Sequence, residues 1–223
     1  MNRYALSFTV KPGSEPAVAD ILRSYRRPPA GAASGPPLLR RTSVFMAGPR
    51  VVRVMDVDGD IGAVMRHLAA QPQIRAVEEA LDPHLSAPRD LSSADGAREF
   101  LHQALLPLTS HRAGPEGQRC ALLYPVRSGR GERLARLLAD GVPTVSTSTF
   151  RRGDVVVRMI EADPSAGDPL EQLARAESTA PAATALAGVL DTQADLTTEA
   201  GLRAFLEECR MDLLTDRRVG VPA

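Results

Sequence analysis

The sequence predicts an α+β protein built from two tandem copies of one folding unit. The first observation is an internal repeat, in which Gly48 and Arg53 are matched 105 positions later by Gly153 and Arg158. The second is the same order of strand and helix periodicities in both halves. Near the start of each copy the offset is 116 instead of 105, so the first copy carries an extra proline-rich loop within residues 26–37. Two copies are too few for a solenoid and favour a fused pseudo-dimer.

The elements of the first copy follow from periodicity and turn residues. Residues 3–10 alternate apolar and polar side chains, which is typical of a strand. Ser14 then begins a helix with apolar residues at spacings of three and four. Residues 38–46 and 50–57 are predicted to form a hairpin around Ala47-Gly48-Pro49.

The first copy continues with helices. Asp58-Gly59-Asp60 begins a helix that Gln71-Pro72 interrupts, and a short strand is predicted near His84. A further helix is predicted after Ser92 as its N-cap. The second copy repeats this pattern, with strands at 119–126, 144–150 and 154–162, a helix start at Asp168-Pro169, and a last helix capped by Thr197.

The order strand, helix, strand, strand, helix, strand is that of a ferredoxin-like unit, here followed by a C-terminal helix. We therefore expect two ferredoxin-like domains, residues 1–109 and 118–223, joined by a link at 109–117. We expect the two sheets to pack as an intramolecular dimeric α/β barrel, because the sheet face away from the helices must be covered. Ligand cavities would lie between sheet and helices or between the domains.

Composition and motifs limit the partners and cofactors that we expect. The chain has 27 basic and 27 acidic residues, so neither nucleic acid nor an anionic membrane is expected as a partner. It has no apolar run of membrane-spanning length, and its two cysteines, Cys120 and Cys209, are expected to fill the core of a cytoplasmic protein. Glycine-rich nucleotide motifs are absent and the four histidines lack metal-ligand spacing, so we expect neither a cofactor nor a metal.

Arg53 and Arg158 are the most informative polar pair. Each stands in the middle of an otherwise apolar strand and must be paired or must face a wet cavity. One interpretation is structural: an exposed sheet face, or a carboxylate partner at the pseudo-two-fold axis. The other is a clamp for a carboxylate, enolate or phenolate of a ligand.

Two histidines in the first copy are candidate proton acceptors. His67 lies beside the apolar stripe of the second helix, and His84 lies in the predicted fourth strand. An imidazole could take a phenol proton and so favour reaction with dioxygen. A packed or edge histidine is the alternative for both, and His102 and His111 are expected on the surface. Because the second domain has no histidine, we expect Arg53 to matter more than Arg158.

Aromatic and methionine side chains on neighbouring strands could line an aromatic pocket. The candidates for substrate binding, besides Arg158, are Tyr4, Phe45, Met55, Tyr124 and Phe150. Ordinary core packing is the alternative for all of them.

The tandem unit, the opening strand followed by Pro-Gly, the turns at Gly48 and Gly153, and the closing helices after Asp-Leu-Ser-Ser and Asp-Leu-Thr-Thr resemble the SchA/CurD-like domain family. The resemblance implies a role in aromatic polyketide biosynthesis in actinobacteria. It also implies kinship with dimeric α/β barrel proteins, which include antibiotic biosynthesis monooxygenases that need neither metal nor flavin, and polyketide cyclases. It supplies no catalytic motif, so the candidate residues above rest on the chain's own pattern.

The expected function is a cofactor-independent oxygenase that hydroxylates an aromatic polyketide intermediate or oxidises it to a quinone. Arg53 or Arg158 would stabilise the substrate anion, with His67 or His84 as proton acceptor. A polyketide cyclase and a non-catalytic polyketide-binding protein remain alternatives. The expected partners are an aromatic polyketide and, as an open possibility, polyketide synthase components. The chain would be a monomeric pseudo-dimer or a homodimer.

Overall fold

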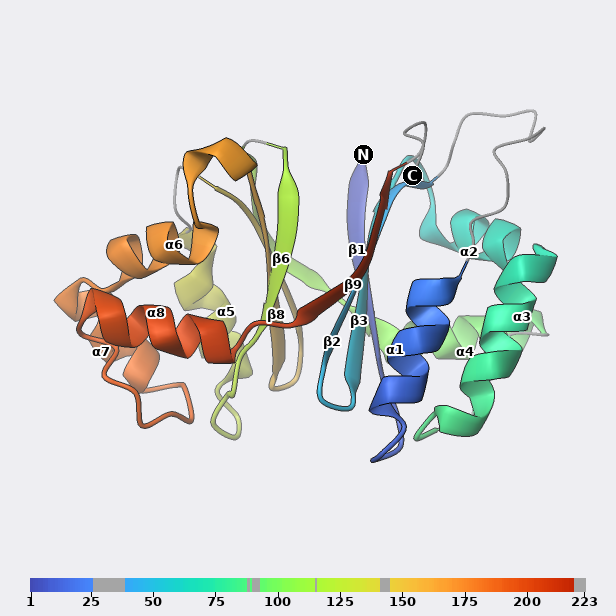
Figure 1. Ribbon diagram of the computed structural model, residues 1–223, viewed down its shortest axis with the longest axis horizontal. Coiled ribbons are helices and arrows are strands. Elements are labelled where there is room, and N and C mark those ends of the chain that lie inside the picture. The colour runs from blue at the N-terminus through green and yellow to red at the C-terminus, as the bar shows by residue number, and fades with distance from the viewer. Residues whose placement is uncertain (26–38, 88, 90–92, 115, 141–144, 219–223) are drawn as a thin grey trace. The chain divides into compact units, whose positions relative to one another are not determined.

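The computed structural model describes residues 1–25, 39–87, 89, 93–114, 116–140 and 145–218. The predicted loop at 26–37 therefore lies outside the described residues. The chain divides into two compact units: unit 1 contains residues 1–106 and 213–223, and unit 2 contains residues 107–212. Each unit is an antiparallel sheet with helices over one face (Figure 1), which confirms the predicted α+β class.

Unit 1 has a five-stranded sheet in the order β4-β1-β3-β2-β9. Its strands are β1 (Asn2–Thr9), β2 (Leu39–Ala47), β3 (Arg50–Val57), β4 (Leu105–Leu106) and β9 (Asp212–Arg218). Strand β3 lies between β1 and β2 and runs antiparallel to both, which is the split βαβ arrangement of a ferredoxin-like unit. The register places Arg53 between Leu6 on β1 and Val44 on β2.

The helices of unit 1 bury apolar stripes against one face of this sheet. They are α1 (Glu15–Ser24), α2 (Ile61–Ala69), α3 (Pro72–Leu81), the short 3₁₀ helix η1 (Asp82–His84) and α4 (Ala94–Ala104). Val18 and Leu22 of α1 pack with Val51 of β3, and Val64 of α2 packs with Met55. Burying each such side chain contributes about 1.5–3 kcal/mol. The predicted break at Gln71-Pro72 separates α2 from α3.

Unit 2 repeats the architecture. Its sheet has the order β5-β7-β8-β6, with β5 (Leu108–Arg112), β6 (Gln118–Leu123), β7 (Ser146–Arg152) and β8 (Val155–Ala162). Its helices are α5 (Gly131–Leu137), η2 (Leu138–Asp140), η3 (Pro164–Ala166), α6 (Pro169–Glu177), α7 (Ala180–Ala187) and α8 (Glu199–Glu208). An apolar cluster joins the sheet to α5, η2, α6, α7 and α8.

The backbone confirms the internal repeat at its turns. Gly13 and Gly129 have φ of +84° and +74°, and Gly48 and Gly153 have +49° and +57°. Side chains other than glycine rarely adopt these values. Each pair follows the sequence offset, so equivalent strands end in equivalent turns.

The prediction of a strand near His84 is wrong. Residues Asp82–His84 form η1, and Leu85 makes only an isolated bridge to Val10. Pro83 has no N–H to donate to a strand ladder. The fourth strand of the ferredoxin-like order is β4, which follows α4 directly.

The predicted link at 109–117 is also partly wrong, because residues 108–112 form β5 and pair with β7. After α8 the chain likewise enters β9, which is hydrogen-bonded to β2 in the sheet of unit 1. One edge strand of each sheet therefore follows the last helix of the other half of the chain. The observed units differ for this reason from the expected domains, 1–109 and 118–223, chiefly in residues 213–223.

The last helix of each copy is capped one residue later than predicted. Ser93 caps α4, with its Oγ accepting from the Gly96 N–H at 3.0 Å, and Thr198 caps α8 by the same contact to Gly201 at 3.1 Å. Thr197 donates its hydroxyl to the Asp195 carboxylate instead, at 2.6 Å. In the second copy Thr198 takes the cap role, because Thr197 uses its hydroxyl on Asp195.

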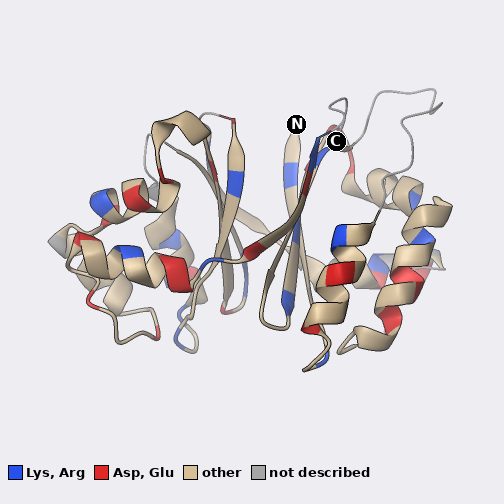
Figure 2. Cartoon of the chain, in the orientation of Figure 1, with Lys and Arg blue, Asp and Glu red and all other residues tan. Residues whose placement is uncertain are grey.

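The helices of both units carry interspersed acidic and basic residues (Figure 2). Within the described residues, no helix has the length and apolar character needed to cross a membrane.

Candidate functional site

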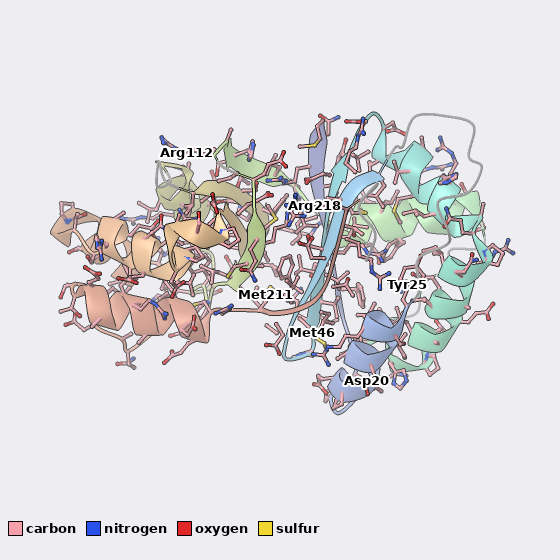
Figure 3. The ribbon with its side chains drawn as sticks, turned by 45° about the horizontal axis from the view of Figure 1, so that its top comes forward. Asp20, Tyr25, Met46, Arg112, Met211 and Arg218 are labelled. Carbon is pink, nitrogen blue, oxygen red and sulfur yellow. The ribbon has the colours of Figure 1, made fainter. Side chains whose placement is uncertain are left out.

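A small cavity lies inside unit 1, between the sheet and helices α1 and α3. Its volume is about 20 Å³, which holds about one water-sized group. It is lined by Leu22, Tyr25, Thr42, Val44, Arg53, Ile74, Val77, Glu78, Thr215 and Arg217. Tyr25 stands at the C-terminal end of α1, where Figure 3 labels it.

Arg53 is a positively charged residue in the lining of this cavity. It is half-buried in the middle of β3 and makes no hydrogen bond or ion pair with any described residue. Thr42 Oγ1, from the neighbouring strand, is buried and also has no hydrogen-bond partner there. Unpaired buried polar groups are costly, so both groups favour a polar guest in the cavity.

Glu78 is already engaged by another arginine. The Arg89 guanidinium forms an ion pair with Glu78 and lies over two aromatic rings, 4.8 Å from the centroid of Phe8 and 5.1 Å from that of Phe100. Burial lowers the pKa of Arg89, as does the nearby positive charge of Arg53, while Glu78 opposes both effects. Arg89 therefore pairs with Glu78, and Arg53 has no carboxylate partner among the described residues.

A third guanidinium completes the group. Arg217 of β9 lies 4.7 Å from the centroid of the Tyr25 ring and donates to the Tyr25 carbonyl. Arg53, Arg89 and Arg217 carry three positive charges and Glu78 carries one negative charge, a local excess of two (3 − 1) among these four side chains. The arrangement suits an anionic group, because guanidinium donors match the oxygens of carboxylates and phenolates.

The equivalent position in unit 2 is internally neutralised. Arg158 is fully buried and donates to Glu177 at 2.7 Å. Burial alone would lower the pKa of Arg158, but the adjacent Glu177 and Tyr124 raise it above its ordinary value. Burial likewise raises the pKa of Tyr124, whose hydroxyl lies beside Arg158 without a hydrogen bond of normal geometry. In unit 2 the arginine is therefore ion-paired, although its Nε and Nη2 atoms have no hydrogen-bond partner among the described residues, whereas Arg53 has no ion pair there.

The two candidate histidines do not line the cavity with Arg53. His67 is exposed on α2, with its Nε2 3.1 Å from Gln71 Nε2. His84 lies in η1, with its Nδ1 3.1 Å from Ser14 Oγ at the start of α1. The structure therefore places neither imidazole in the cavity lined by Arg53 and Arg217.

Three of the aromatic and methionine candidates pack in apolar clusters of their units, and the other two are buried. Tyr4 and Met55 pack in one apolar cluster of unit 1, and Tyr124 packs in that of unit 2. Phe45 and Phe150 are fully buried. Phe45 lies on the face of β2 opposite to Thr42 and Val44, because side chains alternate along a strand.

Sequence reasoning missed Glu78, Arg89 and Arg217. Nothing in the local pattern distinguishes them from surface charges, since each comes from a different element of the unit. The repeat held one usable signal: position 78 is matched by Ala183 and position 89 by Ala194, so both charges belong to the first copy alone.

A second recess is an open groove of about 540 Å³ in unit 2. Its volume is in the range of small-molecule sites. The ring of Tyr124 packs against Phe205 there, with 6.4 Å between ring centroids, and burial raises the pKa of the Cys209 thiol to about 12. The charged side chains of the lining are Asp191 and Glu208, both acidic, so the groove does not match an anion.

Comparison with known proteins places the chain in a family. The SchA/CurD-like domain matches residues 1–113, about half of the chain. The chain belongs to the SchA/CurD-like domain family. The match covers the first copy of the repeat, which is also the copy with the open arginine.

Three curated relatives extend the similarity over the whole chain. Polyketide synthase CurD of Streptomyces cyaneus is 42% identical over 243 aligned positions, covering 100% of this chain and 65% of CurD. The 42.8 kDa protein in the whiE locus of Streptomyces coelicolor is 41% identical, covering 97% of this chain and 58% of that protein. Protein SchA of Streptomyces halstedii is 41% identical, covering 97% and 61%. The chain thus spans about three fifths of the length of these relatives.

Solved structures with a related chain path are distant. A Fusobacterium nucleatum protein named for an inferred monooxygenase activity is 10% identical, with a TM-score of 0.44 over 98% of this chain and 94% of that one. An anthrone oxidase-like protein is 11% identical, with a TM-score of 0.33 over 98% and 93%. Likeness at this level carries no argument about the site.

Proposed function

We propose that this chain binds the anion of an aromatic polyketide intermediate in unit 1 and promotes its oxidation by dioxygen. One observation carries the proposal: Arg53, half-buried between sheet and helices, faces a cavity without a carboxylate partner among the described residues. Family membership and the name of the relative polyketide synthase CurD support the substrate class.

The size of the cavity limits what enters it. About 20 Å³ admits an oxygen atom and not a fused ring, so the ring system of a ligand must lie outside the described walls. Arg53 and Thr42 Oγ1 would hold the oxyanion, and Arg217 would contribute positive charge. This is stabilisation of a developing anion by donors fixed in advance, because β-sheet hydrogen bonds on both sides hold the backbone of Arg53.

The proposed reaction balances without an added reductant. Ionisation of a phenol or enol raises the electron density of the ring. An activated ring CH₂ then reacts with dioxygen: its two C–H bonds break, one oxygen atom becomes a carbonyl, and the other leaves as water. The substrate supplies all the electrons. The role of the protein is to favour the ionised form and hold it in place.

Oxygen consumption by the purified chain with a dihydroxyanthrone tests this proposal. We expect one dioxygen consumed per anthrone, with the corresponding quinone identified by mass spectrometry, at a rate above that with heat-denatured protein. A changed ring pattern in a poly-β-ketone without oxygen consumption would indicate a cyclase. Saturable binding with no product of either kind would indicate a non-catalytic binding protein.

A further inference from the structure

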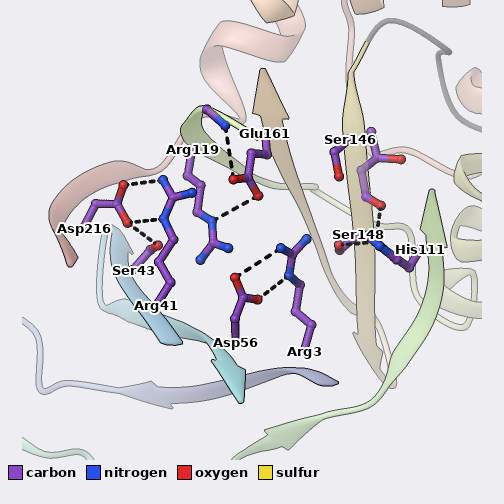
Figure 4. Close-up of polar contacts among 12 residues, drawn as sticks. Arg3, Arg41, Ser43, Asp56, His111, Arg119, Ser146, Ser148, Glu161 and Asp216 are labelled. Atoms are coloured by element: carbon purple, nitrogen blue, oxygen red, sulfur yellow. Dashed lines mark hydrogen bonds and ion pairs between the residues drawn. The ribbon is translucent and has the colours of Figure 1, made fainter. Parts of the chain in front are cut away.

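A row of polar side chains crosses the sheet of each unit, on the face away from the helices. In unit 1 the row is fully ion-paired (Figure 4). Arg3 donates to Asp56 at 2.6 Å, and Arg41 holds Asp216 through two contacts of 2.9 and 2.6 Å. Ser43 Oγ adds a hydrogen bond of 2.8 Å to the same Asp216 carboxylate.

The repeat places equivalent residues in unit 2. Arg119 and Glu161 take the positions of Arg3 and Asp56, and they form the same pair at 3.4 Å. The other half of the row is different. Ser146, Ser148 and His111 stand where unit 1 has Arg41, Ser43 and Asp216. The ion pair of Arg41 and Asp216 in unit 1 is thus replaced in unit 2 by Ser146 and His111.

The contacts of His111 favour one tautomer of its ring. Its Nδ1 lies 3.1 Å from the Thr147 carbonyl oxygen and 3.0 Å from Ser148 Oγ (Figure 4). A carbonyl oxygen can only accept, so the Thr147 contact favours a hydrogen on Nδ1 of the neutral ring, while the Ser148 hydroxyl fits either tautomer. The lone pair then lies on Nε2, which has no hydrogen-bond partner among the described residues.

The imidazole is oriented and accessible at once. His111 is exposed on the edge strand β5, while Ser146 and Ser148 beneath it are buried. Ser146 Oγ donates to the Arg112 carbonyl at 3.1 Å, which holds β5 against β7. A fixed Nδ1–H with an open Nε2 is the arrangement by which proteins present histidine as a proton acceptor.

We propose that His111 is a proton acceptor in a second site, on unit 2, that takes a neutral phenol or enol. The phenolic O–H bond breaks, the proton moves to Nε2, and a phenolate and an imidazolium result, with no change in oxidation state. Ser148 and the Thr147 carbonyl are positioning groups that stabilise the imidazolium through Nδ1–H. The ligand class rests on the proposed function, whereas the tautomer and the proton transfer are properties of unit 2 alone.

Nitrogen-15 NMR of the full chain tests the geometry first. The chain has only four histidines, so the four imidazoles can be assigned by single substitutions. We expect neutral His111 to carry its proton on Nδ1, in contrast to the Nε2–H form usual for a free histidine side chain. A His111 signal of the Nε2–H form would overturn the proposal. In Ser148→Ala the Nδ1–H form should persist through the Thr147 carbonyl, with a shifted Nδ1 resonance.

Proton transfer is tested with a dihydroxyanthrone under nitrogen, in an Arg53→Met background so that the site of unit 1 cannot ionise the probe. We expect long-wavelength phenolate absorption on binding, together with a second proton on His111. His111→Gln should abolish the absorption, and the matched change His102→Gln should leave it intact. Phenolate formation that persists in His111→Gln would overturn the proposal. If His111 responds in this variant but the chain with Arg53 intact consumes no oxygen in air, the proposed function fails while this inference stands.

Discussion

At the scale of single residues, the two halves treat one arginine in opposite ways. Arg53 has no ion pair with any described residue, whereas Arg158 is paired with Glu177 in a buried core. The difference arises outside the strands, since position 177 of the second copy corresponds to Pro72 of the first. A buried guanidinium that loses its carboxylate partner is destabilising, whereas one that faces a polar cavity can be retained for binding.

Arg158 should therefore be a stability residue. We expect Arg158→Met to lower the free energy of unfolding by about 3–5 kcal/mol, because the mostly buried Glu177 carboxylate loses its partner. The double change Arg158→Met with Glu177→Gln should recover most of this loss. Chemical denaturation of the three proteins measures both effects, and equal stability of the single and double variants would contradict the paired role.

At the scale of elements, equivalent helices use equivalent caps. Thr198→Val should cost about 0.5–2 kcal/mol, because the Gly201 N–H at the start of α8 loses its acceptor. Thr184→Val, at an exposed position within α7, is the matched control and should change stability little. The thermal unfolding midpoint reports the difference. A control as destabilising as Thr198→Val would show that the cap contact has no special weight.

At the scale of the whole molecule, the chain supplies each sheet with an edge strand from the other half. Strand β9 protects the edge of β2 by hydrogen bonding and brings Asp216 to Arg41. A chain ending after Asp212 should lose hydrogen-exchange protection in β2, while β7 of unit 2 keeps its own. Unchanged protection of β2 amides in the truncated chain would contradict the observed strand order.

The sequence predicted what depends on periodicity and repetition. Alternation and turn glycines predicted the strands around Gly48 and Gly153, and the doubled pattern marked Arg53 as unusual. No strand forms near His84, and Pro83 lacks the N–H that a strand ladder needs. Periodicity alone cannot distinguish the isolated bridge of Leu85 from a strand. The site escaped prediction where it depends on packing. Contacts between distant segments pair Glu78 with Arg89 and place Arg217 of β9 in the cavity lining.

The row of polar residues could have been predicted from the sequence. Arg3 and Arg119, like Asp56 and Glu161, follow the two offsets of the repeat. Comparing the copies position by position also pairs His111 with Asp216, which is the substitution on which the second site depends. The assignment of residues 109–117 to a link hid this correspondence, because β5 was not expected to be a strand.

The most direct test of the central claim compares Arg53→Met with the double change Arg158→Met and Glu177→Gln in the same oxygen-uptake assay with a dihydroxyanthrone. Losing a charged donor to an anion costs about 1.5–3 kcal/mol. The rate or affinity of Arg53→Met should therefore fall about 10- to 150-fold with the fold intact. The double variant, which removes the equivalent but paired arginine, should keep its activity. Equal losses in both proteins, or full activity in Arg53→Met, would contradict the assignment of the anion site to unit 1.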